Sequence, residues 1–343
     1  MRSAGWMVAV VSLLWAGTAE AALTFGVVSP GVKVKPTDTP DLNPKAALKA
    51  ARNEFESFQV VVRSDDGPVT GVSMRLSKPL SGPGELPSSA LTLYRVGYHK
   101  VSHPSNVEGA AGPWPDPLIP DVDTYFGEKR NAFPFDVPEG ETRAVWVDVL
   151  VPTDAKPGDY VGELEVSAGG ALVGTVPIEL HVGSFALPST SSLASAFGMG
   201  WADPCLAHTG QVSCTTSWDE DMGNGLRALY LRSSLEHRFG ISSTDYQPPF
   251  EGSAAYYEKY VLPYVNGTGE SRLPGARLTA VELDGEDDDV AGWVQYAKDK
   301  GFFERLFYYP VDEPMNSGDW AKLVASASAA HAADPATRVI ITS

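Results

Sequence analysis

The first half of the chain alternates apolar and polar positions with a period of two, which is the pattern of β-strands. In "AVWVDVLVP", the valines at alternate positions from Val145 to Val151 share one face, and the residues between them share the other. Similar runs occur at "FESFQVVVRS", "LTLYRVGYHKV", "YVGELEVSA" and "LVGTVPIELHVGSF". Turn sequences such as "SDDGP" and "DAKPGDY" separate these runs without an intervening helix. Residues 22–188 are therefore predicted to form an antiparallel β-sandwich.

Two segments of this half lack the alternation. "NPKAALKAARNEFE", residues 43–56, has a helix-like composition, and we interpret it as a loop or short turn that leads into a strand. Residues 103–138 are crowded with Pro and Gly, which interrupt regular structure. We interpret this insert as a long loop that folds over a neighbouring surface.

After "FALPSTSSLAS" the period changes, because strand-like runs now alternate with helical ones. The strand-like runs are "SAFGMGW", "FGIS", "ARLTAVELDG", "ERLFYYPVDEP" and "RVIITS". Helical periodicity falls at residues 218–238, 252–265, 287–301 and 317–334. This alternation predicts a parallel sheet with crossover helices. A Gly-rich phosphate loop follows none of these strands, so a nucleotide-binding fold is disfavoured.

Residues 189–343 are therefore expected to form a (β/α)8 TIM-type barrel that carries the catalytic site. Five strand–helix steps precede Ser343, whereas a closed barrel needs eight. We expect a barrel that is truncated at its C-terminus, with an unusual open sheet as the alternative. The predicted fold class is multidomain, β plus α/β: an N-terminal antiparallel β-sandwich followed by this partial barrel.

The N-terminus has the pattern of a secretory signal peptide. An apolar run from Trp6 to Gly17 precedes "TAEAA", which offers an A-x-A cleavage site at Ala19 and Ala21. The run is shorter than the roughly 20 apolar residues of a membrane span, and a signal anchor is the alternative. We expect residues 1–21 to be removed and the mature chain to be secreted or periplasmic, without membrane attachment.

Charge and cysteine content narrow the classes of partner. The net charge is −17 and the 26 Lys and Arg residues are scattered, which disfavours nucleic acid and favours a neutral or weakly charged substrate.

Cys205 and Cys214 lie close together, which in an exported protein predicts a local disulfide. Metal binding with His208 is the rival, but that set lacks a fourth ligand. The acidic run 282–290 lacks calcium-loop spacing and is better explained as the start of a helix, so no metal or cofactor is predicted.

Asp312 and Glu313 stand where an apolar, aromatic strand stops, and in a barrel the catalytic groups lie at this end of the strands. Adjacent strand residues point to opposite faces, so the backbone must twist or leave the sheet if both acids are to face one pocket. Such a pair suits glycoside cleavage in which the acetamido group of the substrate is the nucleophile. One carboxylate would orient that group, and the other, kept protonated by its neighbour's charge, would protonate the leaving oxygen. An acidic turn or helix N-terminus is the alternative.

Four motifs in order, "ARNEFESFQVVV", "VWVDVLVPTDAKPGDYVGELEVSA", "YLRSSLEHRFGIS" and "FYYPVDEP", resemble glycoside hydrolase family 123 and the related proteins grouped as domain of unknown function 4091. The resemblance covers most of the mature chain. It implies a β-sandwich, a catalytic (β/α)8 barrel and a retaining, substrate-assisted β-N-acetylgalactosaminidase. It further implies that Asp312 stabilises the acetamido group and that Glu313 is the general acid. The family's later barrel strands, which supply further sugar contacts, have no counterpart here, and a chain truncated in this way is expected to be inactive.

Other residues are weaker candidates for the substrate site. Tyr309 and Trp201 could stack on sugar rings, with core packing as an even alternative. His237 and Arg238 end the first barrel helix, where capping is favoured over a sugar contact. The expected partner is an oligosaccharide or glycoconjugate. Two other hypotheses are a non-catalytic carbohydrate-binding protein of the same fold and a glycosidase for sugars without an acetamido group.

Overall fold

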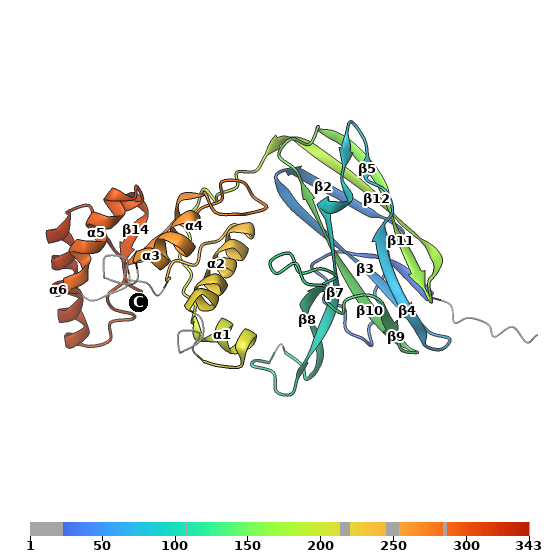
Figure 1. The fold of residues 1–343 in the computed structure, drawn as a ribbon. Helices are drawn as coiled ribbons and strands as arrows, with labels where there is room; N and C mark the ends of the chain where they lie inside the picture. Colours follow the sequence, from blue (N-terminus) through green and yellow to red (C-terminus); the bar gives the residue numbers. More distant parts are fainter. Residues whose placement is uncertain (1–22, 108, 213–219, 245–253, 284–286, 343) are drawn as a thin grey trace, which may run out of the picture. The chain divides into compact units, whose positions relative to one another are not determined.

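The structure, a computed structural model, describes residues 23–107, 109–212, 220–244, 254–283 and 287–342 (Figure 1). The predicted signal peptide lies outside the described residues. The chain divides into two compact units, Met1–Ala186 and Leu187–Ser343. None of the helices in the described part of the chain has the length and apolarity that a membrane span requires.

The first unit is built from two β-sheets and a single 3-10 turn, Ser88–Ala90, within its described residues. One sheet has the order β1 (Leu23–Val28), β3 (Glu54–Ser64), β10 (Glu141–Val151), β7 (Leu91–Val101), β8 (Gly112–Pro120). The other has the order β2 (Ala46–Arg52), β12 (Ala171–Ala186), β11 (Gly158–Ala168), β4 (Val69–Leu76), β9 (Phe135–Val137), with β5 (Leu80–Ser81) and β6 (Glu85–Leu86) beside β11. Neighbouring strands are antiparallel except β2 and β12, which are parallel.

The core of this unit lies between the two sheets. Val145, Val147, Val149 and Val151 on β10 are fully buried, as the alternation along "AVWVDVLVP" predicts. They belong to one apolar cluster with residues of β3, β4, β11 and β12, so both sheets contribute to it. A period of two along each strand is what lets one face enter this core while the other meets solvent. The sandwich prediction is confirmed for these strands.

The interpretation of residues 46–52 as loop is wrong, because this segment is strand β2. Ala46, Leu48 and Ala50 are buried and alternate with exposed neighbours. The strand pairs in parallel with the long strand β12, in the register Leu48 to Leu180. A partner strand far away in the sequence therefore overrides the helix-like composition of "AALKAAR".

The Pro-rich insert 103–138 is only partly a loop. It contains β8, "GPWPDPLIP", and the short strand β9. Proline is tolerated there because β8 is an edge strand of its sheet, with β7 as its one partner among the described strands. The long-loop interpretation is thus wrong for residues 112–120 and 135–137, since proline content alone does not distinguish an edge strand from a loop.

The second unit alternates strands with helices. Its helices are α1 (Ala202–Thr209), α2 (Glu220–Glu236), α3 (Ala254–Tyr256), α4 (Leu262–Asn266), α5 (Val290–Asp299) and α6 (Ser317–Ala333), with a π-helical turn, Tyr257–Val261, before α4. Its strands are β13 (Val281–Leu283), β14 (Leu306–Tyr308) and β15 (Arg338–Val339), and 3-10 turns cover Asp287–Asp289 and Phe303–Arg305. The helical periodicities of the sequence are confirmed, whereas α1 had no sequence signal that we recognised. Figure 1 shows α5 and α6 side by side next to β14.

Five extended segments of this unit lie side by side in chain order. β13, β14 and β15 form a three-stranded sheet. Before them, Phe197 and Ile241 form a parallel bridge, and the Glu282 N–H donates to the Ser242 carbonyl at 3.1 Å. The result is a curled half-barrel sheet with helices between successive segments. A closed (β/α)8 barrel is not confirmed by the described residues.

Candidate active site

The acid pair follows β14 at the carboxyl edge of the parallel sheet, the edge at which the strands end. β14 ends at Tyr308, and the chain has left the sheet when it reaches Asp312 and Glu313, as the sequence argument requires. The Ile340 N–H donates to the Tyr308 carbonyl at 2.9 Å, which continues the pairing of β14 and β15. This register places Thr342, just after the last strand, beside the loop that carries the acids.

Three side chains form a hydrogen-bonded triangle around one carboxylate. The Tyr309 hydroxyl donates to Asp312 Oδ1, and Thr342 Oγ1 donates to the same oxygen at 2.8 Å. The two hydroxyl oxygens lie 2.6 Å apart. The Tyr309 bond and then the Thr342 bond favour the charged form and lower the pKa of Asp312, while the same contact with Asp312 raises the pKa of Tyr309. Asp312 is therefore an oriented, ionised carboxylate that is still exposed to solvent.

Glu313 has a backbone conformation that is rare for residues with a side chain. Its φ is 42°, in the left-handed region, which costs a non-glycine residue about 1–2 kcal/mol. Its N–H donates to Thr342 Oγ1 at 3.3 Å, and Pro314 follows. Turning the chain at this residue ends the strand alternation, so the rule that neighbours point to opposite faces does not apply to the pair. The Glu313 side chain is exposed.

The start of α6 has its own capping groups. The Asn316 side chain accepts hydrogen bonds from the Gly318 and Asp319 N–H groups at 2.8 and 3.1 Å. Asp319 Oδ2 in return accepts from the N–H groups of Met315 and Asn316, which completes a capping box. The alternative explanation of the acid pair as the helix N-terminus is therefore disfavoured, because other residues satisfy these donors.

Trp201 lies at the same edge of the sheet but is packed inside the unit. It is 6% exposed, its ring meets Tyr230 edge-on at 6.5 Å, and the Arg227 guanidinium lies 5.7 Å from its centroid. Its indole N–H donates to the Ser243 carbonyl at 3.2 Å, which joins the loops after the first two extended segments. This geometry matches the core-packing alternative, and a stacking role on sugars stays a prediction.

His237 and Arg238 lie at the opposite, amino edge of the sheet. They end α2 in a Schellman motif, in which the Arg238 N–H donates to the Leu235 carbonyl and the Phe239 N–H to the Ser234 carbonyl. Arg238 takes the left-handed position with φ 59°. A crossover helix runs against the strands, so its C-terminus meets the start of the next strand and not its end. The structure thus supports the capping role and does not bring these residues to Asp312.

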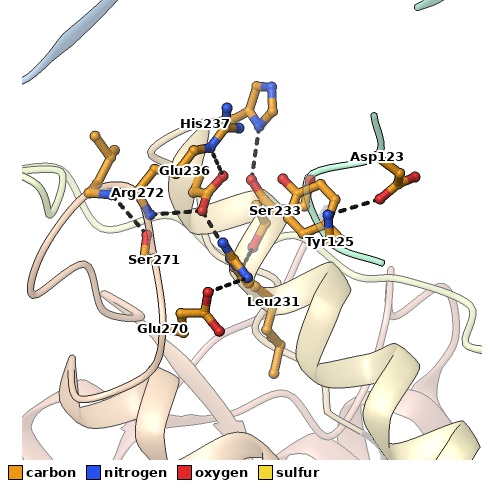
Figure 2. A network of polar contacts seen from close by, with 12 residues as sticks. Asp123, Tyr125, Leu231, Ser233, Glu236, His237, Glu270, Ser271 and Arg272 are labelled. Atoms are coloured by element: carbon orange, nitrogen blue, oxygen red, sulfur yellow. Dashed lines mark hydrogen bonds and ion pairs between the residues drawn. The ribbon is translucent and has the colours of Figure 1, made fainter. Parts of the chain in front are cut away.

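A network of charged side chains fixes the same end of α2, and Figure 2 shows Glu236 at its centre. The fully buried Glu236 carboxylate accepts from Arg232 Nε at 3.1 Å, from Arg272 Nε at 2.7 Å and from the Arg272 N–H at 2.9 Å. Burial alone would raise the pKa of Glu236, but the contacts with Arg272 and Arg232 outweigh it and lower the pKa. Arg232 also contacts the exposed Glu270 at 3.1 Å.

The remaining predicted groups are placed as follows. Cys205 is buried on α1, whereas Cys214 lies outside the described residues, so the disulfide stays a prediction. Tyr308 is buried, as core packing predicts, and its hydroxyl donates to Asp287 at 2.8 Å. Among the described residues, no three His, Cys, Asp or Glu side chains are arranged to hold a metal ion. Thr342 was missed by the sequence argument, although it lies at the end of the last strand-like run, "RVIITS".

Comparisons with known proteins point to one family. Residues 32–168 match the sequence model described as the glycoside hydrolase 123 N-terminal domain. The chain is also similar to a solved structure titled as a family 123 glycoside hydrolase from Clostridium perfringens, in a study of glycolipid glycan hydrolysis. The TM-score is 0.57 and the identity 14%, with 90% of this chain and 62% of that chain covered. The chain therefore spans less than two thirds of the length of that structure, and at this identity the likeness establishes the fold.

Other comparisons are weaker. AvmM, a protein that catalyses macrocyclization in alchivemycin A biosynthesis, gives a TM-score of 0.25 at 12% identity, covering 50% of this chain and 93% of its own. The N-terminal domain of PorA gives 0.19 at 8% identity, covering 47% and 99%. No curated protein sequence matches the chain.

Proposed function

The chain is a glycoside hydrolase family 123-like protein, and from this premise we propose that it hydrolyses a β-linked N-acetylhexosamine, chiefly N-acetylgalactosamine, in an oligosaccharide or glycoconjugate. The proposed mechanism is retaining and substrate-assisted, so the acetamido oxygen of the sugar takes the place of an enzyme nucleophile. The observation that carries the proposal is the ionised, solvent-facing Asp312, held by two hydroxyls beside Glu313.

Asp312 has the properties that the acetamido group needs. As the carbonyl oxygen attacks the anomeric carbon, positive charge develops on the acetamido nitrogen, and its N–H requires an acceptor. A carboxylate with a lowered pKa stays ionised through the neutral range and can accept that bond. Tyr309 and Thr342 donate to Oδ1, and no other described residue donates to Oδ2, so that oxygen can accept from the substrate. Pre-oriented acceptors of this kind stabilise developing charge without reorganisation.

Glu313 is the proposed general acid. It donates its proton to the leaving oxygen while the bond from that oxygen to the anomeric carbon breaks and the bond to the acetamido oxygen forms. It then takes a proton from the water that opens the cyclic intermediate, which restores the acid and retains the anomeric configuration. Its left-handed backbone and the bond from its N–H to Thr342 fix the main chain next to Asp312.

Tyr309 acts through Asp312 in this proposal. Its hydroxyl donates to the carboxylate, so Tyr309 is a positioning residue for the acid. Because one hydroxyl hydrogen serves one acceptor at a time, this hydroxyl does not also donate to the substrate. Stacking of the Tyr309 ring on a sugar stays a prediction.

Hydrolysis of para-nitrophenyl β-N-acetylgalactosaminide by the full chain tests the proposal. Glu313→Gln and Asp312→Asn are each expected to lower kcat/KM by about 10²–10⁴-fold, the usual contribution of a positioned acid or base. Glu304→Gln is the matched control, because its carboxylate is 90% exposed before β14 and has no proposed role.

The matching glucosaminide and the plain galactoside separate the hypotheses. Turnover of acetamido sugars alone supports substrate assistance, whereas turnover of the galactoside with a trappable glycosyl-enzyme contradicts it. No turnover of any of the three by folded protein would reject the proposed activity and favour the non-catalytic carbohydrate-binding alternative.

A further inference from the structure

The β-sandwich unit contains a groove of about 570 Å³ whose lining residues have no role in the proposed hydrolysis. One side is formed by β4 and β7 around Arg75 and Thr92, and the other by residues 121–134. Its volume lies within the 300–1,000 Å³ that is usual for ligand pockets. We name it the β4–β7 groove. All of its lining residues belong to the first unit.

The floor of the groove is apolar and rigid. Leu76, Leu93 and Phe133 line it, and all three pack against the main core cluster of the sandwich. The Phe133 ring lies 5.9 Å from that of Phe135, which is buried in the same core. A partly exposed aromatic ring backed by a packed core offers a flat apolar surface, and the C–H face of a sugar ring can pack on such a surface.

One wall is a short hairpin, residues 121–130, that is tied down by its own hydrogen bonds. Val122 and Lys129 form an antiparallel bridge. The Asp123 carboxylate accepts from the N–H groups of Tyr125 and Phe126 at 2.9 Å and from Arg130 at 3.1 Å. Burial raises the pKa of Asp123, but these contacts outweigh it and lower the pKa. The hairpin is thus held in place before any ligand arrives, which reduces the entropic cost of binding.

Residues with hydrogen-bond donors and residues with acceptors line the groove. Thr92 and Thr124 contribute hydroxyls, Asp121 a carboxylate and Lys129 an ammonium group. Among the described residues, neither the Asp121 nor the Lys129 side chain has a hydrogen bond or ion pair, although Asp121 is half-buried. The Arg75 guanidinium is paired with Glu165 at 2.7 Å. The lining therefore combines donors and acceptors with balanced charge, which suits hydroxyl groups better than a phosphate or a carboxylate.

We propose that the β4–β7 groove is a second, non-catalytic glycan-binding site that takes one or two residues of a neutral oligosaccharide. The sugar face packs on Phe133 and Leu93, and its hydroxyls reach Asp121, Lys129 and the two threonines. This site would hold a glycan independently of the acid pair, so it goes beyond the proposed hydrolysis and does not depend on it.

Isothermal titration of the full chain carrying Glu313→Gln tests the site, because this background prevents turnover during the measurement. The probes are lactose, N-acetylgalactosamine and N,N′-diacetylchitobiose at millimolar concentrations. Thr124→Trp fills the groove from an exposed position on the hairpin, and Asp121→Ala with Lys129→Ala removes its polar groups. Each change is expected to weaken binding of lactose, which lacks the acetamido group that Asp312 would hold, at least about tenfold, the effect of losing roughly 1.4 kcal/mol.

The controls are exposed residues of the same types on the same unit. Thr70, changed to Trp, lies at the start of β4 and does not line the groove. Lys49, changed to Ala, lies on β2, and strands β12 and β11 separate β2 from β4. Both are expected to keep the parent affinity, and all variants the parent unfolding temperature, since the changed side chains outside the core carry little stability.

Three outcomes would overturn the inference. One is the absence of binding by every probe. Another is binding that is lost with Asp312→Asn but kept by both groove variants, since the glycan would then sit at the acid pair. The third is a dimer, seen by sedimentation, that Thr124→Trp dissociates, which would assign the groove to a second copy of the chain. Glycan binding without hydrolysis would reject the proposed function and leave the groove standing.

Discussion

Glu236 and Asp312 are carboxylates at opposite edges of the same parallel sheet, and their contacts lower the pKa of both. Glu236 is fully buried and held by two arginines, so all of its surface is used by the protein. Asp312 faces solvent and is held by two neutral hydroxyls on a single oxygen. The first arrangement fixes a helix end, whereas the second orients a charge and leaves part of it unoccupied. A lowered pKa therefore identifies a functional carboxylate only together with its exposure and the kind of partner it has.

Removing the charge of Glu236 or of Asp312 should separate effects on stability from effects on activity most clearly. Glu236→Gln is expected to lower the free energy of unfolding by about 2–3 kcal/mol, near the lower end for a broken buried pair, because Arg272 is partly exposed. Urea unfolding measures this loss. Asp312→Asn should leave the unfolding midpoint unchanged while it removes hydrolysis.

Glu270→Gln is the control within the Glu236 network, because this carboxylate is 80% exposed and contacts only Arg232 among the described ion pairs. Surface ion pairs contribute about 0–1 kcal/mol, so a small effect is expected. Equal losses from Glu270→Gln and Glu236→Gln would contradict the structural role assigned to the buried carboxylate.

Thr342→Val sharpens the other half of the comparison. The change removes a hydroxyl that donates to Asp312, so the ionised form loses support and kcat/KM is expected to fall about tenfold. Because the lowered pKa of Asp312 rises when this donor is lost, the acid limb of the pH profile should move to higher pH. Steady-state kinetics across the acid range measures both effects.

Thr175→Val, on β12 of the other unit, is the matched control for that substitution. A fall in kcat/KM with no movement of the acid limb would mean that Thr342 only supports the loop. Such a result would mean that Thr342 does not stabilise the ionised form of Asp312.

Arg238→Ala should have the smallest effect on catalysis. The residue lies at the amino edge, where its Nε donates to the Pro188 carbonyl at 3.1 Å, and it holds the left-handed position of the α2 cap. We expect kcat/KM to stay within about twofold of the parent, with a stability change of under about 1 kcal/mol. A loss as large as that of Asp312→Asn would show that this edge contacts the substrate after all.

The sequence predicted best where a local pattern decides the structure. The β10 valines alternate because one face enters the core, and the strand–helix order of the second unit follows from periodicity. β2 was missed because its structure depends on a partner, β12, that lies over a hundred residues away. β8 was missed because a proline-rich segment is predicted as a loop unless it is known to be an edge strand, and the sequence alone does not show which strands lie at the edge.

The site divides in the same way. Asp312 and Glu313 could be placed at a strand end from the run before them, and the resemblance supplied their proposed roles. Thr342 could not be paired with them, because its contact with Asp312 depends on the register of β14 and β15. His237 and Arg238 could have been set aside earlier, since a crossover helix ends at the amino edge of its sheet and catalytic loops gather at the other.

The prolines of β8 have a consequence for the behaviour of the protein at high concentration. An edge strand normally offers a free row of N–H and C=O groups to which a strand of another molecule can bind. β8 closes one end of its sheet, and Pro113 and Pro115 oppose Lys100 and Tyr98 of β7 while offering no N–H of their own. The N–H groups of alternate residues point to the same side of a strand, so Pro113 and Pro115 both lack a donor on the same side. That side faces away from β7, because N–H groups on the β7 side are needed for pairing. The prolines that made this strand resemble a loop thus protect this edge of the sheet from edge-to-edge aggregation.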